Sequence, residues 1–359
     1  MSFFHLLTCL VMAFCTTNAL TQNEGTNARQ ESKTNLTRIV QTASLTPTIV
    51  HKFPQGTWVE NLAIRQSDGN VVVTILSSPD VYLVSSASAF EPVLLAHFPG
   101  NLGCAGIVEV GLNIFYAVVG NYSVSTTEAT PGSWSIWKVD LTEHHVDHAH
   151  QGHIVTTQVA VLPAAGFLNG MTVLDPHSGT VLVADSLYSA VWSVNVWSGH
   201  VAIAINDTTM STAPELAGGF ALGINGLHYP GDGYLYYDNT DRATFNRIRY
   251  DALAGVVTGP VETLVANSFS NVIFDDFTID FAGNTWLATD SGEVVLLRDV
   301  KHGGHPDIEI VASSTTGNFT GLTSAKLAAS KTGRRKDSLY ATTSGGLLVK
   351  YEVAQLGVC

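Results

Sequence analysis

The chain has 359 residues, and its 30 acidic side chains outnumber its 17 lysines and arginines, which gives a net charge of −13. Hydrophobic residues make up 45% of the sequence, which excludes a disordered chain. The shortage of cations argues against nucleic-acid binding, because a basic stripe is needed to release phosphate counterions. We therefore expect a folded protein without a nucleic-acid partner.

The N-terminus has the pattern of a secretory signal peptide. The apolar stretch from Leu6 to Phe14 is too short to span a membrane, and small residues follow it at the positions that signal cleavage requires. We interpret residues 1–19 as the signal, with a buried N-terminal helix as the alternative. No later segment is long and apolar enough to span a membrane, so we expect a soluble protein, secreted or held in the lumen of the secretory pathway.

Signal cleavage would leave two cysteines, Cys104 and Cys359. In an oxidising compartment this pair is a candidate disulfide. Four glycosylation sequons support the secretory route, at Asn35, Asn121, Asn206 and Asn318. The polar residues 20–46 are expected to be disordered or loosely attached.

A repeat organises the remaining residues. Asn169-Gly-Met-Thr-Val leads through a turn to a second apolar run, and Asn225-Gly-Leu-His-Tyr does the same. Six such units begin at residues 60, 105, 169, 225, 275 and 320. This period predicts an all-β, six-bladed β-propeller with four-stranded antiparallel blades over residues 47–359, closed by a strand from Pro47 to Phe53. A two-sheet sandwich is the alternative, but it would not predict six similar units.

The first residue of each unit opens an innermost strand, so six side chains should surround one mouth of the central channel. They are Glu60, Ala105, Asn169, Asn225, Asp275 and Thr320. Their oxygens suit Ca²⁺ or another divalent cation, and equally a ligand carbonyl or acid–base chemistry. Capping of strand backbone is the alternative role for such residues. The long loop from Asn121 to Ser133 should lie over the same mouth as a lid.

The sequence resembles the SMP-30/gluconolactonase-like propellers over residues 49–355, on units such as Asn225-Gly-Leu and Asp275-Asp-Phe-Thr-Ile-Asp280. The resemblance implies that Glu60, Asn225 and Asp275 bind a divalent metal and that Asn169 contacts substrate. In sugar lactonases an arginine stands two residues before the substrate asparagine, where this chain has Phe167. Without the several hydrogen-bond donors of that guanidinium group, the site favours an apolar ligand.

Trp58-Val-Glu60-Asn-Leu-Ala-Ile-Arg65, with Tyr236-Tyr-Asp-Asn-Thr240 and Phe245-Asn-Arg-Ile248, is more closely similar to the fungal secreted branch of these propellers. That branch includes the hetero-Diels–Alderases of tropolone–sesquiterpenoid pathways. The resemblance implies a pericyclase with no obligatory cofactor, acting on small apolar substrates of tropolone and terpene type. A metal-dependent lactonase or esterase and a noncatalytic small-molecule carrier are the alternatives, and the oligomeric state stays open.

The predicted catalytic residues are Glu60 and Asp275, as proton donor and acceptor, with Asn169 and Asn225 as hydrogen-bond donors to a substrate carbonyl. The predicted substrate pocket comprises Phe167, Tyr122, Asp185, Asp241 and Asp276. Phe167 and Tyr122 are expected to supply its apolar wall.

Overall fold

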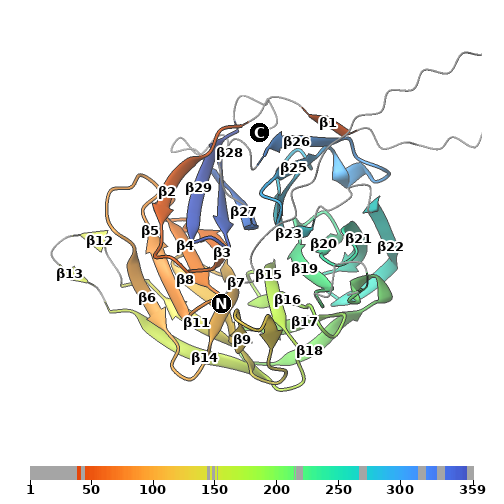
Figure 1. Cartoon of the computed structure of the whole chain (residues 1–359). Coiled ribbons are helices and arrows are strands. Elements are labelled where there is room, and N and C mark those ends of the chain that lie inside the picture. The colour runs from red at the N-terminus through yellow and green to blue at the C-terminus, as the bar shows by residue number, and fades with distance from the viewer. Residues whose placement is uncertain are drawn as a thin grey trace, which may run out of the picture. The chain divides into compact units, whose positions relative to one another are not determined.

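The computed structural model describes residues 39–41, 45–143, 146–147, 150–151, 153–213, 215, 221–266, 273–313, 321–329 and 336–353. The unit that contains them, Thr37–Cys359, is a six-bladed β-propeller with four-stranded antiparallel blades around a central axis, which confirms the predicted fold (Figure 1). Helical structure in the described residues is limited to two short 3₁₀ turns, η1 (Thr208–Met210) and η2 (Val300–His302). No helix in this part of the chain has the length and apolar character needed to cross a membrane.

Each blade runs outward from an inner strand that lines the axis. The first three blades are β3 (Val59–Ile64), β4 (Val71–Ile75), β5 (Asp80–Val84) and β6 (Val93–His97); β7 (Gly103–Glu109), β8 (Ile114–Gly120), β11 (Trp134–Asp140) and β14 (Val155–Leu162); and β15 (Leu168–Asp175), β16 (Thr180–Asp185), β17 (Ala190–Asn195) and β18 (Val201–Asn206). Two small hairpins project from the second blade, namely β9 (Tyr122–Ser123) with β10 (Glu128–Ala129), and β12 (Val146–Asp147) with β13 (His150–Gln151).

The last three blades repeat the same order. They are β19 (Ile224–His228), β20 (Tyr234–Asn239), β21 (Thr244–Asp251) and β22 (Val256–Ala266); β23 (Phe274–Ile279), β24 (Thr285–Thr289), β25 (Val294–Leu297) and β26 (Ile308–Ala312); and β27 (Leu322–Ala329), β28 (Lys336–Thr343), β29 (Leu347–Glu352) and β2 (Thr48–Lys52). β2 therefore completes the last blade by pairing antiparallel with β29, which confirms the predicted closing strand.

The described part of the N-terminal segment is attached to the propeller, whereas the expectation for residues 20–38 lies outside the described residues. Within residues 20–46, β1 (Ile39–Gln41) pairs in parallel with β26 at the outer edge of the fifth blade. Leu45 is buried, and its amide donates to Val311 O at 2.6 Å. An outer strand offers unpaired backbone groups along its edge, so a passing segment of chain can add to it even when its composition is polar. Residues 1–38 and 42–44, which include the predicted signal, lie outside the described residues.

Burial falls from the axis outward. The second strand β4, with sequence VVVTI, is buried at every position, because blades pack against it on both faces. The outer strand β22 is mostly exposed. β-branched and aromatic residues favour such strands, and their contacts between blades make up the hydrophobic core. This rigid ring of sheets fixes the positions of the side chains at its axis.

Candidate functional site at the channel mouth

Every inner strand carries a β-bulge at the position where the sequence repeat begins. The strand pairing skips one or two residues there, for example between Leu168 and Met171 and between Phe274 and Phe277. A bulge re-aims side chains and is common beside active sites. The bulged residues include four of the predicted ring residues: Glu60, Asn169, Asn225 and Asp275. In the sixth blade the bulge is at Thr323, whereas the predicted Thr320 lies outside the described residues.

Glycine follows the ring residue in three blades, at Gly106, Gly170 and Gly226. A Cβ on Gly170 would lie 2.5 Å from Asn225 O, and one on Gly106 would lie 2.4 Å from Asn169 O. No larger residue fits, since real Cβ atoms do not approach this closely. Glycine therefore lets neighbouring inner strands approach one another and brings the ring side chains together.

Hydroxyl groups join several pairs of neighbouring blades beside this ring. Thr74 Oγ1 donates to Ala105 O at 2.6 Å, and Ser186 Oγ donates to Ile224 O at 2.6 Å. Thr240 Oγ1 makes the same contact to Phe274 O at 2.9 Å. Buried hydrogen bonds of this kind fix the relative position of adjacent inner strands.

The buried Glu60 and the half-buried Asp275 form a pair of protonatable carboxyl groups at this mouth. Trp58 Nε1 donates to Glu60 Oε2 at 2.5 Å. Burial raises the pKa of Glu60 to about 7, and repulsion by Asp276 adds to the rise while the Trp58 hydrogen bond opposes it. Burial, followed by repulsion from Glu60, raises the pKa of Asp275 well above its ordinary value. Two such acids in one place are typical of catalytic sites.

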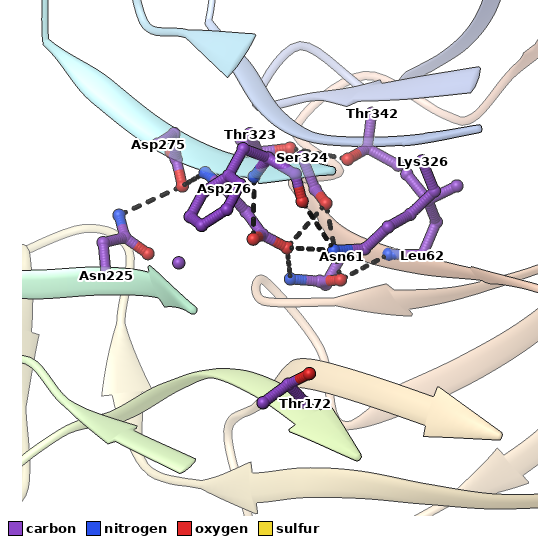
Figure 2. Close-up of polar contacts among 12 residues, drawn as sticks. Asn61, Leu62, Thr172, Asn225, Asp275, Asp276, Thr323, Ser324, Lys326 and Thr342 are labelled. Atoms are coloured by element: carbon purple, nitrogen blue, oxygen red, sulfur yellow. Dashed lines mark hydrogen bonds and ion pairs between the residues drawn. The ribbon is translucent and has the colours of Figure 1, made fainter. Parts of the chain in front are cut away.

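Asn225 connects this acid pair to the fourth blade. Its Nδ2 donates to Asp275 Oδ1 at 3.0 Å (Figure 2). It also donates to Thr240 Oγ1 at 3.0 Å. Its Oδ1 is buried and has no hydrogen-bond partner among the described residues. An orphaned buried acceptor normally meets a donor or a cation, so Asn225 Oδ1 marks a place for one.

An aromatic wall lies beside the acids. Tyr122, in the hairpin of the long loop, is stacked on Phe167 with ring centroids 5.0 Å apart, and Phe167 also contacts Trp134 at 5.0 Å. Burial, then the charges of Glu60 and Asp275, raises the pKa of Tyr122 to about 12, so its hydroxyl stays neutral near those acids. Trp58 packs against the same cluster. Phe167 is only 2% exposed, so it supports Tyr122 from within the core rather than forming the surface of the wall.

Two of the predicted pocket aspartates have a structural role. Both oxygens of Asp185 are used: they accept from the backbone amides of residues 166, 167, 187 and 188 and from Trp192 Nε1. Asp241 accepts from the amides of Ala213 and Leu222. Asp185 therefore fixes the turn that carries Phe167, and Asp241 holds the backbone at Ala213 and Leu222. Contact of these two residues with substrate stays a prediction.

Asp276, the third predicted pocket aspartate, lies one residue further along the inner strand in a buried network. Its Oδ2 accepts from Asn61 Nδ2, Ser324 Oγ and Lys326 Nζ, each at 3.0 Å (Figure 2). Three donors already satisfy this oxygen, so Asp276 is the centre of a polar plug in the channel, and its contact with substrate stays a prediction. Sequence reasoning missed Lys326, whose only signal was a cation on a strand expected to line the axis.

Asp238 is a second residue that sequence reasoning missed. It is fully buried, accepts from Gly226 N at 2.8 Å, and has an Oδ2 with no partner among the described residues. Burial, then repulsion by Asp276, raises its pKa well above the ordinary value. It therefore adds a further buried acid near Asp275, and burial favours the protonated form of its carboxyl group.

The donors at this mouth suit a hard divalent cation. Glu60 and Asp275 supply carboxylate oxygens, and the orphaned Asn225 Oδ1 supplies a carbonyl oxygen, all of which such cations prefer. A cation would also relieve the repulsion between the two acids. Against this, no cluster of three acidic, histidine or cysteine ligands occurs within the described ranges. The residues fit a weak site more readily than a dedicated cage.

The predicted disulfide and two of the predicted glycosylation sites involve residues that the structure does not describe, namely Cys359, Asn35 and Asn318. Cys104 is buried and is bonded to no cysteine of the described part of the chain, so its pairing with Cys359 stays a prediction. Asn206 is exposed, as a glycosylation acceptor must be, whereas the Asn121 Oδ1 atom is buried. Glycosylation at all four sequons also remains a prediction.

Comparison with solved structures identifies the class of fold. The major allergen Mala s 1 of Malassezia sympodialis aligns with a TM-score of 0.62 at 12% identity, covering 86% of this chain and 96% of that one. A gluconolactonase from Xanthomonas campestris aligns with a TM-score of 0.54 at 14% identity, covering 88% and 99%. At these identities the likeness shows the propeller fold alone.

Sequence comparison is more specific. The chain is 25% identical over 268 residues to a Phoma sp. protein named "Putative hetero-Diels-Alderase", covering 67% of this chain and 71% of that protein. It is 26% identical over 225 residues to a Sarocladium schorii protein of the same designation, covering 56% of this chain but only 53% of that relative. No family model matches the chain. The resemblance drawn from the sequence motifs is thereby confirmed.

Proposed function

We propose that this protein is a pericyclase of hetero-Diels–Alderase type, which joins a tropolone-derived o-quinone methide to a humulene-type sesquiterpene. The observation that carries the proposal is the acid pair Glu60 and Asp275 set against the aromatic surface of Tyr122 and Trp58. The names of the two sequence relatives support an enzyme of this class.

The first step is formation of the quinone methide by loss of water. A carboxyl group donates its proton to the leaving hydroxyl, and a carboxylate accepts the proton of the ring hydroxyl, so that water leaves without any change of oxidation state. Glu60, with its pKa raised to about 7, can exchange a proton in either direction near neutral pH. The repulsion between Glu60 and Asp275 favours one proton shared between them, which provides both roles at once.

The second step is the cycloaddition, in which the oxygen and the methylene carbon of the heterodiene bond to the two carbons of an alkene. It needs two apolar partners in a near-attack pose, and such positioning can supply about 7–11 kcal/mol. The half-buried Trp58 offers a flat apolar face against which a planar tropolone ring can stack, and the buried Tyr122 belongs to the same aromatic cluster. Asn225 uses both amide protons within the protein, so Asn169 is the ring carboxamide assigned to the substrate carbonyl.

The test is to incubate the purified protein with a hydroxymethyl-tropolone precursor and humulene, with and without a chelator. We expect adduct in both cases. Glu60→Gln should slow adduct formation from the hydroxymethyl precursor at least tenfold, yet leave the reaction of a preformed quinone methide nearly unchanged. Glu128→Gln, which changes an exposed acid in the β9–β10 hairpin, is the matched control. Equal loss with both forms of the substrate would contradict the assigned proton transfer.

A metal-dependent lactonase or esterase is the second candidate, because the orphaned Asn225 Oδ1 lies beside two carboxyl groups. When bound, a divalent cation would polarise a lactone carbonyl, and Glu60, Asn225 and Asp275 would hold it. Hydrolysis of a lactone panel that is lost both on chelation and in Asp275→Ala would favour this candidate. Adduct formation that survives chelation would exclude it.

A further inference from the structure

The opposite mouth of the channel contains a cavity that the proposed reaction does not use. Its volume is about 340 Å³, within the range of small-molecule sites. Residues from all six inner strands line it. Three residues after each ring position, the strands contribute Ala63, Val108, Thr172, His228, Thr278 and Lys326. Three residues of strand correspond to roughly 10 Å, so this far ring is separate from the acid pair.

The far ring has two chemically different halves. The third to sixth blades contribute the polar residues Thr172, His228, Thr278 and Lys326, whereas the first two contribute Ala63 and Val108. Further apolar side chains of the lining are Leu62, Ile64, Ile107, Met171, Val173, Leu227 and Leu327, and Gln66, Glu109 and Tyr229 add polar groups. A lining of this kind suits a molecule that is mainly hydrocarbon and has a polar group at one edge.

Lys326 determines which polar group fits. Its Nζ donates to Asp276 Oδ2 and to Phe277 O, both at 3.0 Å, and an ammonium group has a third proton to donate. Thr172 Oγ1 accepts from Tyr229 N at 3.2 Å, which leaves its own proton to donate. Figure 2 shows Thr172 apart from the plug around Asp276, across the channel from Lys326. Lys326 and Thr172 therefore each have a proton left to donate to a ligand.

The charge of the ligand follows from the ion pair. Asp276 already neutralises Lys326, and the protein as a whole carries a net charge of −13. An anionic ligand would bring an uncompensated charge close to Asp276 and to Glu109, which also lines the cavity, and this is costly in a partly buried site. A neutral carbonyl oxygen completes the hydrogen bonds of Lys326 without that cost.

We propose that the far mouth of the channel binds a neutral, mainly hydrocarbon ketone, with its carbonyl oxygen on Lys326 Nζ and its skeleton against Val108 and the neighbouring aliphatic side chains. This site does not rest on the proposed function, since the acid pair lies at the other mouth. The assignment holds whichever reaction the acid pair performs.

The experiment is an NMR titration of the full-length protein with camphor labelled with ¹³C at its carbonyl carbon. We expect saturable binding with a downfield carbonyl shift, because a hydrogen bond from an ammonium polarises the C=O group. Val108→Trp, which fills the apolar half, should weaken binding at least tenfold. Gln66→Trp, at the exposed rim, should weaken it too and covers the case that Val108→Trp does not fold. Glu60→Gln should bind camphor like the wild type.

Several outcomes would overturn the proposal. They are the absence of saturable camphor binding, unchanged affinity in folded Val108→Trp and Gln66→Trp, and loss of binding in Glu60→Gln, which would place camphor at the other mouth. Tighter binding of benzoate than of camphor would refute the argument from charge. Because the readout is binding alone, failure here would leave the adduct assay unaffected.

Discussion

The buried carboxyl group of Glu60 should give this protein a stability that falls between acid and neutral pH. Burial raises the pKa of Glu60 from an ordinary 4.5 to about 7. The folded protein therefore holds this proton more tightly than the unfolded chain. The resulting stabilisation is fully present below pH 4.5, declines as the pH rises, and is lost above about pH 7.

The magnitude follows from the same two values. A pKa difference of one corresponds to 1.36 kcal/mol, so the interval from 4.5 to about 7 corresponds to about 3 kcal/mol of unfolding free energy. Glu60 is 4% exposed, so little solvent screening reduces this value. Glu60→Gln removes the titrating group and should flatten the profile. It also removes repulsion on Asp275, whose pKa should then fall toward its ordinary value.

The assay is urea unfolding at pH 5, 6, 7 and 8, with a chelator present so that no cation holds the carboxyl groups ionised. The wild type should lose about 2.5 kcal/mol more than Glu60→Gln between pH 5 and pH 8, because part of the full effect is already lost at pH 5. Glu128→Gln, at an exposed position, should follow the wild-type profile. Parallel profiles for wild type and Glu60→Gln would refute the assignment of a raised pKa to Glu60.

Three further predictions concern the packing of Phe167, the ion pair of Lys326 with Asp276, and the predicted disulfide. Phe167→Ala should cost about 3–5 kcal/mol in urea unfolding, because it removes a buried ring from between its aromatic neighbours; a loss below 1 kcal/mol would show that the cluster is not packed as described. Lys326→Met should cost about 3 kcal/mol by leaving Asp276 without its cation, and Asp276→Asn in the same chain should restore part of that loss if the pair is coupled. Non-reducing peptide mapping should find Cys104 joined to Cys359, a link that would add about 2–4 kcal/mol, whereas two free thiols would contradict the pairing.

The fold could be predicted from the sequence because each repeat unit consists of residues that are close together in the chain. Each unit combines an apolar run, a glycine- or aspartate-rich turn and a second run, and only a propeller gives six such units equivalent surroundings. The same register gives Glu60, Asn169, Asn225 and Asp275 equivalent positions, so their convergence was predictable as well. Even the closing strand was visible as a short apolar segment ahead of the first unit.

Which polar residues remain available to a ligand was decided by the tertiary structure alone. Asp185, Asp241 and Asp276 look like equally good pocket residues in the sequence, but each is occupied by donors from elsewhere in the fold. Lys326 reaches Asp276 from 50 residues away. Such partners depend on distances between blades that no local pattern encodes. The raised pKa of Glu60 has the same origin, because burial and neighbouring charges exist only once the six inner strands have closed around the axis.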